Sequence, residues 1–401
     1  MNIADTPPVS SLQTATADVS LNVRQRLEQL VTWQREWEQE DARLRQRVYQ
    51  LQLNKTSDRQ RAMQIAGLRR RLQLKLVQQP LEIAAETVKQ VGFAGLRQNL
   101  VEQFASLSKA ERLLWLHNFL FIVTPDLRQL NDKIAQVRAY RSLGQQRNFL
   151  LGGHSGMGKT TYLNWLVAHT PPTVEPERNH VPIVKIDAPV NNKTPRPLFQ
   201  RMLLECGLHY TTRDNEEDLL MKLILCFQQC GVELLVVDEI EQLTRPSLRR
   251  RLLEISNLTP GLPIICASCH PHRWTEGDTE IQGRWNDSFT LRQYTGQRLS
   301  QLLTFVELLL PFTQDSSLAS HHLQTGPDRN DPMAGPARLI EQWTGGILRD
   351  IMILIVGASA QAIRQDLPHL SPSLLAATWQ HIQTHQETDF LAVLRWNGGK
   401  P

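Results

Sequence analysis

The stretch Gly153-His-Ser-Gly-Met-Gly-Lys-Thr160 decides the fold that this sequence predicts. It follows a short apolar run, Phe149 to Leu151, and precedes a segment of helical composition. The pattern G-x-x-x-x-G-K-T between a strand and a helix is typical of a phosphate-binding loop (P-loop). Its glycines allow a tight turn, and the helix N-terminus faces the anion. A glycine-rich turn with a chance lysine is the alternative, but it leaves the flanking strand and helix unexplained.

The expected ligand of this loop is ATP with Mg²⁺. Lys159 is expected to reach the β- and γ-phosphates, and the Thr160 hydroxyl to bind the metal. The predicted nucleotide-binding residues are Gly153, His154, Ser155, Gly156, Met157, Gly158, Lys159, Thr160 and Thr161.

A second motif, Glu233-Leu-Leu-Val-Val-Asp238-Glu239, has four aliphatic residues followed by two carboxylates. This order predicts a buried parallel strand that places acids at its C-terminal end. Asp238 is expected to hold Mg²⁺ through its water shell, and Glu239 to polarise the attacking water. A solvated turn with two acids is the alternative, and the upstream P-loop favours the catalytic interpretation.

Three further residues are candidates for catalysis. Arg349 begins a predicted C-terminal helix, where a cation can contact the γ-phosphate, and Arg284 precedes the last predicted strand, where a neighbouring subunit's nucleotide is expected. For both arginines, a surface salt bridge remains the alternative. Ser268, at the end of a predicted strand, is the expected polar sensor of the γ-phosphate, with His270 as its competitor.

The composition predicts a cytoplasmic protein. The 401 residues suffice for one α/β domain with an extension. No apolar run approaches the roughly 18 residues of a membrane helix, and the first twenty residues are rich in Ser and Thr, unlike a secretion signal. We therefore expect no membrane contact.

Charge is distributed unevenly. Residues 1–150 hold 22 Lys and Arg against 14 Asp and Glu, a net +8, whereas the remaining residues hold 22 against 26, a net −4. Between Lys55 and Lys75 there are seven basic residues and one acidic residue. This cluster predicts either a contact with a polyanion or a solvated helix face.

Five cysteines, an odd number, indicate a reducing compartment. Cys266 and Cys269 have C-x-x-C spacing, and Cys226 and Cys230 are four residues apart, so a zinc site is considered. The apolar run around Cys266 instead favours a small core residue, and no second C-x-x-C pair is present.

The expected fold is an α/β P-loop NTPase with a parallel sheet, a C-terminal helical lid and an α-helical N-terminal extension. The expected domains are a tail (1–20), the extension (21–125), the nucleotide-binding domain (126–295), and the lid with a C-terminal tail (296–401).

Strands are predicted at 149–151, 181–187, 233–238, 262–268 and 288–294. Helices are predicted at 21–53, 58–79, 81–91, 95–106, 110–121, 126–146, 159–168, 197–206, 216–229, 247–256, 297–310, 338–343, 348–365 and 372–386. The first of these helices carries a heptad pattern, and Ser108 is the predicted N-cap of the helix at 110–121.

The motifs together resemble the TniB/TnsC family of AAA+ transposition regulators over about residues 126–365. The resemblance rests on the P-loop, Leu234-Leu-Val-Val-Asp-Glu-Ile-Glu-Gln-Leu243, Leu262-Pro-Ile-Ile-Cys-Ala-Ser268 and Thr344-Gly-Gly-Ile-Leu-Arg-Asp350. It implies an ATPase that assembles as a ring or helical filament on double-stranded DNA. Its implied partners are a target selector of the TnsD/TniQ type and a DDE transposase of the TnsB type. Whether targeting is RNA-guided, as in CRISPR-associated transposons, stays open, and the N-terminal 120 or so residues depart from the family pattern.

DNA contacts are expected from basic and hydroxyl side chains that touch phosphates without reading bases. The candidates are Lys193, Thr194, Arg196, Arg249 and Arg250. Three successive arginines, 249 to 251, cannot all point one way on a helix, because neighbours are about 100° apart. Two other functions remain open: a helicase loader or replication initiator, and a nucleotide switch that does not involve DNA.

Overall fold

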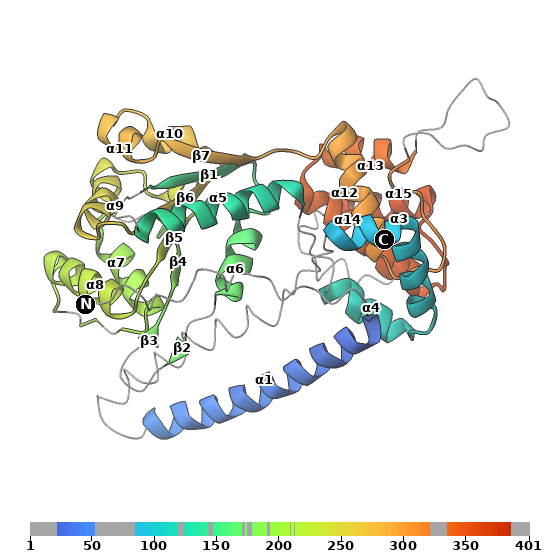
Figure 1. The fold of residues 1–401 in the computed structure, drawn as a ribbon, viewed down its shortest axis with the longest axis horizontal. Helices are drawn as coiled ribbons and strands as arrows, with labels where there is room; N and C mark the ends of the chain where they lie inside the picture. The colour runs from blue at the N-terminus through green and yellow to red at the C-terminus, as the bar shows by residue number, and fades with distance from the viewer. Residues whose placement is uncertain are drawn as a thin grey trace.

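The computed structural model describes residues 22–52, 85–118, 124–142, 147–170, 173–174, 179–190, 193–208, 210–211, 213–320 and 335–385. A sheet with its helices forms one end of the molecule, and an all-helical part forms the other (Figure 1). The predicted helix 58–79, the basic cluster between Lys55 and Lys75, the N-terminal tail and the end of the C-terminal tail lie outside the described residues. No helix of the described chain has both the length and the apolar character needed to cross a membrane.

The main sheet has the strand order β4-β5-β6-β1-β7, and every pairing in it is parallel. Its strands are β1 (Phe149–Gly153), β4 (Ile183–Asp187), β5 (Leu234–Asp238), β6 (Ile264–Ser268) and β7 (Asp287–Leu291). Asp187 is paired with Asp238, and Gly152 with Ser268, so the C-terminal ends of the strands meet at one edge. A small antiparallel pair, β2 (Thr173–Val174) and β3 (Asn179–His180), was not predicted.

The inner strands of this sheet are buried on both faces, because successive residues of β1, β5 and β6 enter two different cores, whereas the edge strand β7 exposes Ser288 and Thr290. Phe149, Leu151 and Val236 belong to one core, whereas Leu150 and Val237 belong to the other. Continuous aliphatic runs such as Leu234 to Val237 are the sequence pattern of such doubly covered parallel strands.

The helices of the sheet domain follow the predicted order. They are α5 (Pro125–Ser142), α6 (Lys159–His169), α7 (Arg196–Glu205), α8 (Glu216–Gln229) and α9 (Pro246–Leu258). The 3-10 turn η2 (Ile240–Gln242) and two short helices, α10 (Pro271–Thr275) and α11 (Thr279–Arg284), were not predicted. The lid consists of α12 (Gly296–Leu309), α13 (Pro336–Thr344), α14 (Leu348–Arg364) and α15 (Pro372–His385). Sheet order, P-loop strand and lid together form the AAA+ P-loop fold that the sequence predicts.

The N-terminal helices are α1 (Val23–Gln52), α3 (Ala85–Ala105) and α4 (Lys109–Asn118). Where two helices, 81–91 and 95–106, were predicted, α3 is continuous, so Gly92 and Gly95 do not interrupt it. The Ser108 cap is confirmed: its hydroxyl accepts from the Glu111 N–H at 3.3 Å, and its own N–H donates to the Glu111 carboxylate at 2.8 Å. Of the heptad residues of α1, Val23, Leu27 and Leu30 are buried, and the side chains at 37, 44, 48 and 51 lie outside the described set.

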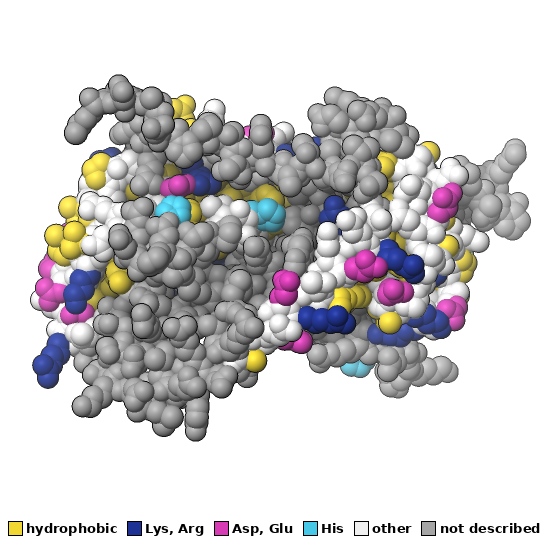
Figure 2. Space-filling model, turned by 60° about the horizontal axis from the view of Figure 1, so that its bottom comes forward, with side chains coloured by type: hydrophobic (Ala, Val, Ile, Leu, Met, Phe, Trp, Pro, Cys, Tyr) yellow, Lys and Arg dark blue, Asp and Glu magenta, His cyan; other side chains and the backbone are white. Residues whose placement is uncertain are grey.

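The N-terminal helices pack on the lid. In Figure 1, α3 and α4 lie beside α12 and α14, and α1 extends from them along the lower side of the molecule. Phe104 and Trp115 enter the same core as Leu303 and Leu354 of the lid, and the Trp115 indole N–H donates to the Leu309 carbonyl at 2.9 Å. Over this half of the lower face, basic and acidic side chains lie interspersed (Figure 2).

Candidate nucleotide-binding site

The P-loop has the backbone of an anion-binding turn. Gly156 and Gly158 have φ values of 81° and 86°, which residues with a Cβ adopt at a cost. Helix α6 begins at Lys159 without a side-chain cap, so the N–H groups of its first turn are left for an anion. The Lys159 ammonium donates to the carbonyls of Gly153 at 2.6 Å and His154 at 3.1 Å.

The rest of the predicted loop residues line the same turn. His154, Ser155 and Thr160 are exposed, Thr161 is half-buried, and Met157 is buried in the core beneath the loop. The His154 ring Nδ1 lies 3.1 Å from the Ser155 carbonyl oxygen. The loop thus presents its backbone and the Thr160 hydroxyl outward, and anchors itself through one apolar side chain.

Three charged residues meet at the ends of β4 and β5. The Lys185 ammonium donates to the Asp187 carboxylate at 2.8 Å and lies 3.7 Å from Asp238 Oδ2. Asp238 is 2% exposed, its Oδ1 accepts from the Glu239 N–H at 3.0 Å, and its Oδ2 has no hydrogen-bond donor. A buried carboxylate oxygen without a donor is costly unless a cation approaches it.

This oxygen makes the strand end suitable for Mg²⁺. A hard divalent cation prefers carboxylate and hydroxyl oxygens and keeps several waters. Asp238 provides the carboxylate, and Thr160 is an exposed hydroxyl at the start of α6. The donor set present therefore fits the metal that the sequence predicts.

Glu239 has φ 53° and ψ 41°, in the left-handed region that is unfavourable for a non-glycine residue. Strained residues of this kind concentrate at functional sites. The pKa of Glu239 is raised above that of an ordinary glutamate. The largest cause is partial desolvation, and the negative charges of Asp238, Asp187 and Glu241 add to it. The side chain is exposed at the sheet edge, where a water can reach it.

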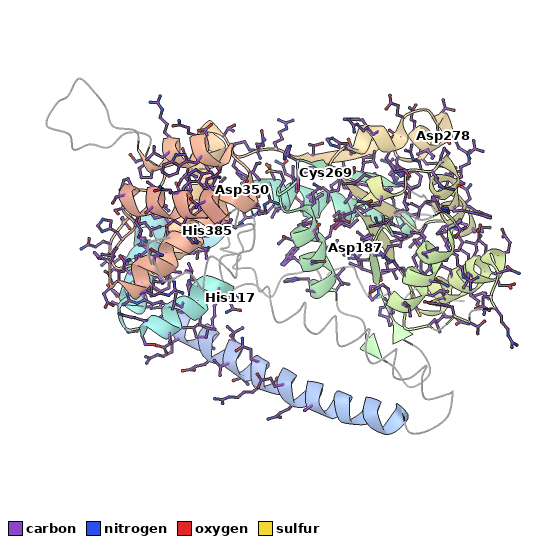
Figure 3. All side chains as sticks on the ribbon, turned by 180° about the vertical axis from the view of Figure 1, so that it is seen from behind. His117, Asp187, Cys269, Asp278, Asp350 and His385 are labelled. Atoms are coloured by element: carbon purple, nitrogen blue, oxygen red, sulfur yellow. The ribbon has the colours of Figure 1, made fainter. Side chains whose placement is uncertain are left out.

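The lid contacts the P-loop directly. The backbone N–H of Arg349 donates to the Gly156 carbonyl at 2.9 Å. A Cβ on Gly156 would lie 2.7 Å from Ile347 Cγ2 and 3.2 Å from Arg349 Cβ, so only glycine allows this approach. Asp350, Cys269 and Asp187 surround the region where lid and sheet meet (Figure 3). The predicted Thr-Gly-Gly-Ile motif thus positions the start of α14 against the loop.

The two candidate arginines lie in different places. Arg349 is over the P-loop, with its Nε 3.0 Å from the carboxylate of its neighbour Asp350 and its side chain 45% exposed. Arg284 ends α11, which lies with α9 and α10 at the end of the molecule opposite the lid (Figure 1). The Arg284 side chain is exposed, and it forms no ion pair or hydrogen bond with the residues that the structure describes.

The end of β6 faces the lysine of the P-loop. Ser268 is buried, and its hydroxyl accepts from the His270 N–H at 2.9 Å, while His270 is exposed. Cys269, between them, has its sulfur 3.4 Å from the Lys159 ammonium. The C-x-x-C spacing therefore does not form a metal pair, because Cys266 is buried in the core and Cys269 lies at the P-loop.

The candidate DNA-binding residues divide into two groups. Lys193 and Thr194 are exposed, and Arg250 is 72% exposed with only a 3.7 Å contact to Asp278. Arg196 instead donates to the carbonyls of Asp214 and Thr211. Arg249 likewise donates to the carbonyls of Leu243, Arg273 and Trp274.

The prediction that the three successive arginines point in different directions is confirmed. Arg249 is directed at backbone carbonyls, Arg250 at solvent, and Arg251 at the carboxylates of Glu216, Glu217 and Glu254.

Three polar residues of the site were missed by the sequence analysis: Asp187, Lys185 and Cys269. Asp187 carried the same signal as Asp238, since it also ends an apolar strand. Lys185 carried no signal, and the C-x-x-C spacing of Cys269 did not point to the P-loop, because the role of both residues depends on which strands are neighbours.

Comparison with known proteins gives a family for part of the chain. Residues 112–266 match the model of the bacterial TniB protein family. This range includes the P-loop, Asp238 and Glu239, and it ends at Cys266, before Arg284 and the lid. No curated protein sequence matches the chain.

Among solved structures, the chain is similar to the ORC2 protein of Aeropyrum pernix in ADPNP–ADP complexes, with 16% identity and a TM-score of 0.43 over 65% of this chain and 69% of that one. It is similar to the ORC1 protein of the same organism in complex with DNA, with 16% identity and a TM-score of 0.43 over 65% and 68%. It is also similar to the RuvB Holliday junction branch migration motor of Thermotoga maritima, with 12% identity and a TM-score of 0.40 over 64% and 68%. The family match and the geometry of the loop and strand ends agree: residues 112–266 match the bacterial TniB family model, and they lie on an AAA+ P-loop ATPase fold.

Proposed function

We propose that this protein is an ATP-dependent regulator of DNA transposition, which assembles on double-stranded DNA and links target selection to a DDE transposase. The observation that carries the proposal is that the TniB-family match contains both the P-loop and the strand-end carboxylates Asp238 and Glu239. The part of the chain that resembles a transposition protein is thus the part with the chemistry of an ATPase.

In the proposed reaction, the first N–H groups of α6 and the Lys159 ammonium bind the phosphates of ATP. Lys159 exchanges its contacts with the Gly153 and His154 carbonyls for phosphate oxygens. Thr160 and Asp238 would hold Mg²⁺, which would supply positive charge beside the phosphates. Glu239 accepts a proton from the attacking water.

We propose that nucleotide occupancy controls assembly through the lid and through a neighbouring subunit. Arg349 lies against the P-loop, where its guanidinium can contact the γ-phosphate. Arg284 is exposed, apart from the P-loop of its own chain, and suits a role as the arginine finger of a neighbour's site. Such a shared site requires a homo-oligomer, either a ring or a helical filament.

DNA would be bound through its phosphates by Lys193, Thr194 and Arg250, which are exposed. Arg196 and Arg249 would position the adjacent loops, since their guanidinium groups are directed at backbone carbonyls. The proposed partners in the cytoplasm are a target selector of the TnsD/TniQ type and a transposase of the TnsB type. Hydrolysis of ATP would then disassemble the complex.

The test is ATP hydrolysis by the full chain with and without duplex DNA, together with capture of the transposase from the same transposon. Stimulation by duplex and ATP-dependent capture of the transposase support the proposal. Lys159→Ala is expected to abolish both, whereas Lys222→Ala, on the exposed face of α8, leaves them unchanged. Capture of a replicative helicase in place of the transposase, or hydrolysis indifferent to duplex, would contradict it.

A further inference from the structure

Three cysteines from two helices meet in the core on one side of the sheet. Cys206 follows the end of α7, Cys226 lies in the last turn of α8, and Cys230 caps that helix. All three are buried, with exposures of 1%, 1% and 6%. Their sulfur atoms all lie within 4.8 Å of one another, and none is in a disulfide.

The local backbone explains the arrangement. Cys226 and Cys230 are one helical turn apart, so they share a face of α8. Helix α7 packs against α8 and ends beside that face, where Cys230 Sγ lies 4.0 Å from the Cys206 carbonyl oxygen. The Cys230 carbonyl in turn accepts from the Val181 N–H at 2.8 Å, which ties the cluster to the start of β4.

The sulfur spacing is that of ligands around one ion. A disulfide requires sulfurs about 2.05 Å apart, whereas the Cys226 and Cys230 sulfurs are 3.9 Å apart. With metal–sulfur bonds of about 2.3 Å, tetrahedral or trigonal coordination places sulfurs about 3.8 to 4.0 Å apart. The three thiols are therefore spaced to coordinate a metal with small side-chain movements.

We propose that Cys206, Cys226 and Cys230 bind one thiophilic d¹⁰ cation, Zn²⁺ or Cu⁺, which ties the ends of α7 and α8 together. Soft thiolate ligands select these ions over Mg²⁺. The site is separate from the nucleotide site. Its three cysteines belong to the buried core that also contains Leu203 of α7 and Leu223 and Phe227 of α8. Its role would be structural, because all three cysteines are buried in the core.

A fourth ligand would distinguish the two ions. Structural Zn²⁺ is almost always four-coordinate, whereas Cu⁺ is satisfied by soft ligands in lower number. His180 lies next to the cluster: a Cβ on Gly231, the residue after Cys230, would be 3.3 Å from His180 Nε2. The His180 ring lies outside the group of three sulfurs and would have to turn toward it to become a ligand. As a fourth ligand it would complete the site for Zn²⁺, whereas Cu⁺ would need only the three sulfurs.

Binding would release protons. Contacts with Cys226 and Cys230, followed by burial, raise the pKa of the Cys206 thiol, so the metal-free group is a neutral thiol. Each thiol that becomes a ligand loses its proton to solvent as the sulfur–metal bond forms. No oxidant is involved. Metal affinity is therefore expected to fall as the pH is lowered.

The experiment is metal analysis of the full-length protein, purified anaerobically without chelator after growth with Zn²⁺ or Cu⁺ and assayed without nucleotide. One Zn or Cu ion per chain is expected, and Co²⁺ is expected to give a thiolate-to-metal charge-transfer band. Cys226→Ser should lose the ion, whereas Cys269→Ser, outside the cluster, should retain it. His180→Ala should lower the content of Zn²⁺ and leave that of Cu⁺ unchanged.

Wild-type protein that binds neither ion and gives no charge-transfer band with Co²⁺ would overturn the proposal, and the three cysteines would then be small core residues. The same holds if Cys226→Ser and Cys269→Ser retain equal amounts of metal. If Cys226→Ser does not fold, the wild-type metal content and the Co²⁺ spectrum decide the question by themselves.

Discussion

Substitution of Glu239 tests the proposed hydrolysis mechanism most directly. This residue combines a left-handed backbone, a position after the buried strand β5 and three neighbouring carboxylates that all raise its pKa. A residue placed only for stability would be expected to avoid this conformation, which costs of order 1–3 kcal/mol.

Replacing Glu239 by Gln is expected to leave ATP binding intact and to lower hydrolysis by about 10² or more, because the amide cannot accept a proton from water. Single-turnover hydrolysis and a fluorescent-nucleotide titration separate the two effects. Glu102→Gln, on the exposed face of α3, is the control. Equal hydrolysis by the Glu239 variant and the wild type would refute the role of the carboxylate.

The pH dependence follows from the direction of the Glu239 shift. A raised pKa keeps the carboxyl group protonated, and so inactive as a base, to higher pH than in an ordinary glutamate. The acid limb of kcat/KM is therefore expected to have its midpoint above about 4.3, the usual glutamate value. Asp187→Asn removes one of the negative charges that raise this pKa and should move the midpoint down. A midpoint that stays in place in this variant would argue against Glu239 as the titrating group.

At the scale of elements, the decisive contact is between α14 and the P-loop. Gly156→Ala places a methyl group against Ile347 and Arg349 in a backbone with φ 81°. The strain of about 1–2 kcal/mol and the contact at 2.7 Å should separate lid and loop. We expect ATP affinity to fall by at least about tenfold, which is 1.4 kcal/mol.

Gly283→Ala in α11 is the control for this variant, since a Cβ there meets nothing within 4 Å. Isothermal titration with ATP measures both proteins. If the two alanine variants bind ATP alike, the lid contact does not contribute to nucleotide binding.

Helices and strands were predictable where neighbouring residues in the sequence determine them. The bounds of α8 follow from the capping box of Asn215 and Asp218 and from the apolar period after it. The strands follow from their aliphatic runs. The continuity of α3 across Gly92 and Gly95 was not predictable, because the helix is stabilised by the lid helix α12, which lies about two hundred residues later in the chain. The short helices α10 and α11 were missed because each is only about one turn long.

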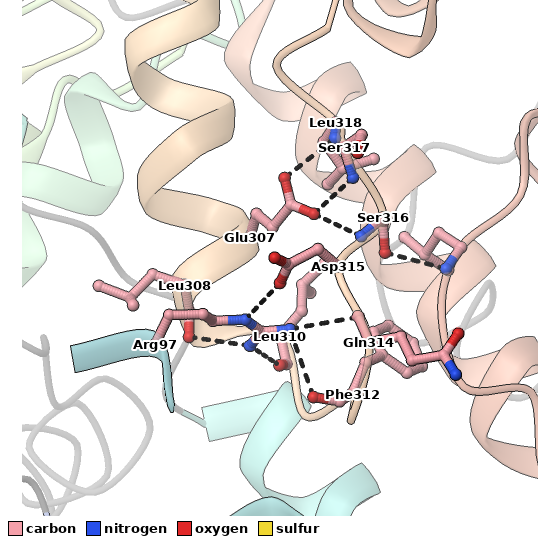
Figure 4. A network of polar contacts seen from close by, with 11 residues as sticks. Arg97, Glu307, Leu308, Leu310, Phe312, Gln314, Asp315, Ser316, Ser317 and Leu318 are labelled. Carbon is pink, nitrogen blue, oxygen red and sulfur yellow. Dashed lines mark hydrogen bonds and ion pairs between the residues drawn. The ribbon is translucent and has the colours of Figure 1, made fainter. Parts of the chain in front are cut away.

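At the scale of the whole molecule, one buried arginine joins the N-terminal helices to the lid. The Arg97 guanidinium donates to the carbonyls of Leu308, Leu310, Phe312 and Gln314 at 3.1 to 3.4 Å and forms an ion pair with Asp315 at 2.9 Å (Figure 4). The next turn of this segment is held by the Glu307 carboxylate, which accepts from the N–H groups of Ser316, Ser317 and Leu318.

Arg97→Met is expected to lower the free energy of unfolding of the lid by about 3 kcal/mol, because it leaves buried carbonyls without a donor. Hydrogen exchange of the 308–318 segment should increase at the same time. Gln98→Ala, an exposed neighbour on α3, is the control. Unchanged exchange in the Arg97 variant would show that the N-terminal helices do not stabilise the lid.

This connection could not be read from the sequence, which predicts the N-terminal helices as a separate extension. Arg97 and its acceptors are more than two hundred residues apart, and a single arginine in a helical segment has no pattern of its own. The same limit applies to Cys206, whose meeting with Cys226 and Cys230 depends on how α7 packs on α8. In contrast, the P-loop and the Asp238-Glu239 pair were predictable, since their chemistry requires a fixed local order of residues.

The central claim, that ATP occupancy drives assembly on DNA, is tested most directly by electron microscopy of the Glu239→Gln protein with linear duplex DNA. With ATP and Mg²⁺ the account predicts rings or filaments on the duplex. It predicts none with ADP, and none for Lys159→Ala with ATP. Particles that remain monomeric with both ATP and duplex, in a preparation shown to bind ATP, would contradict it.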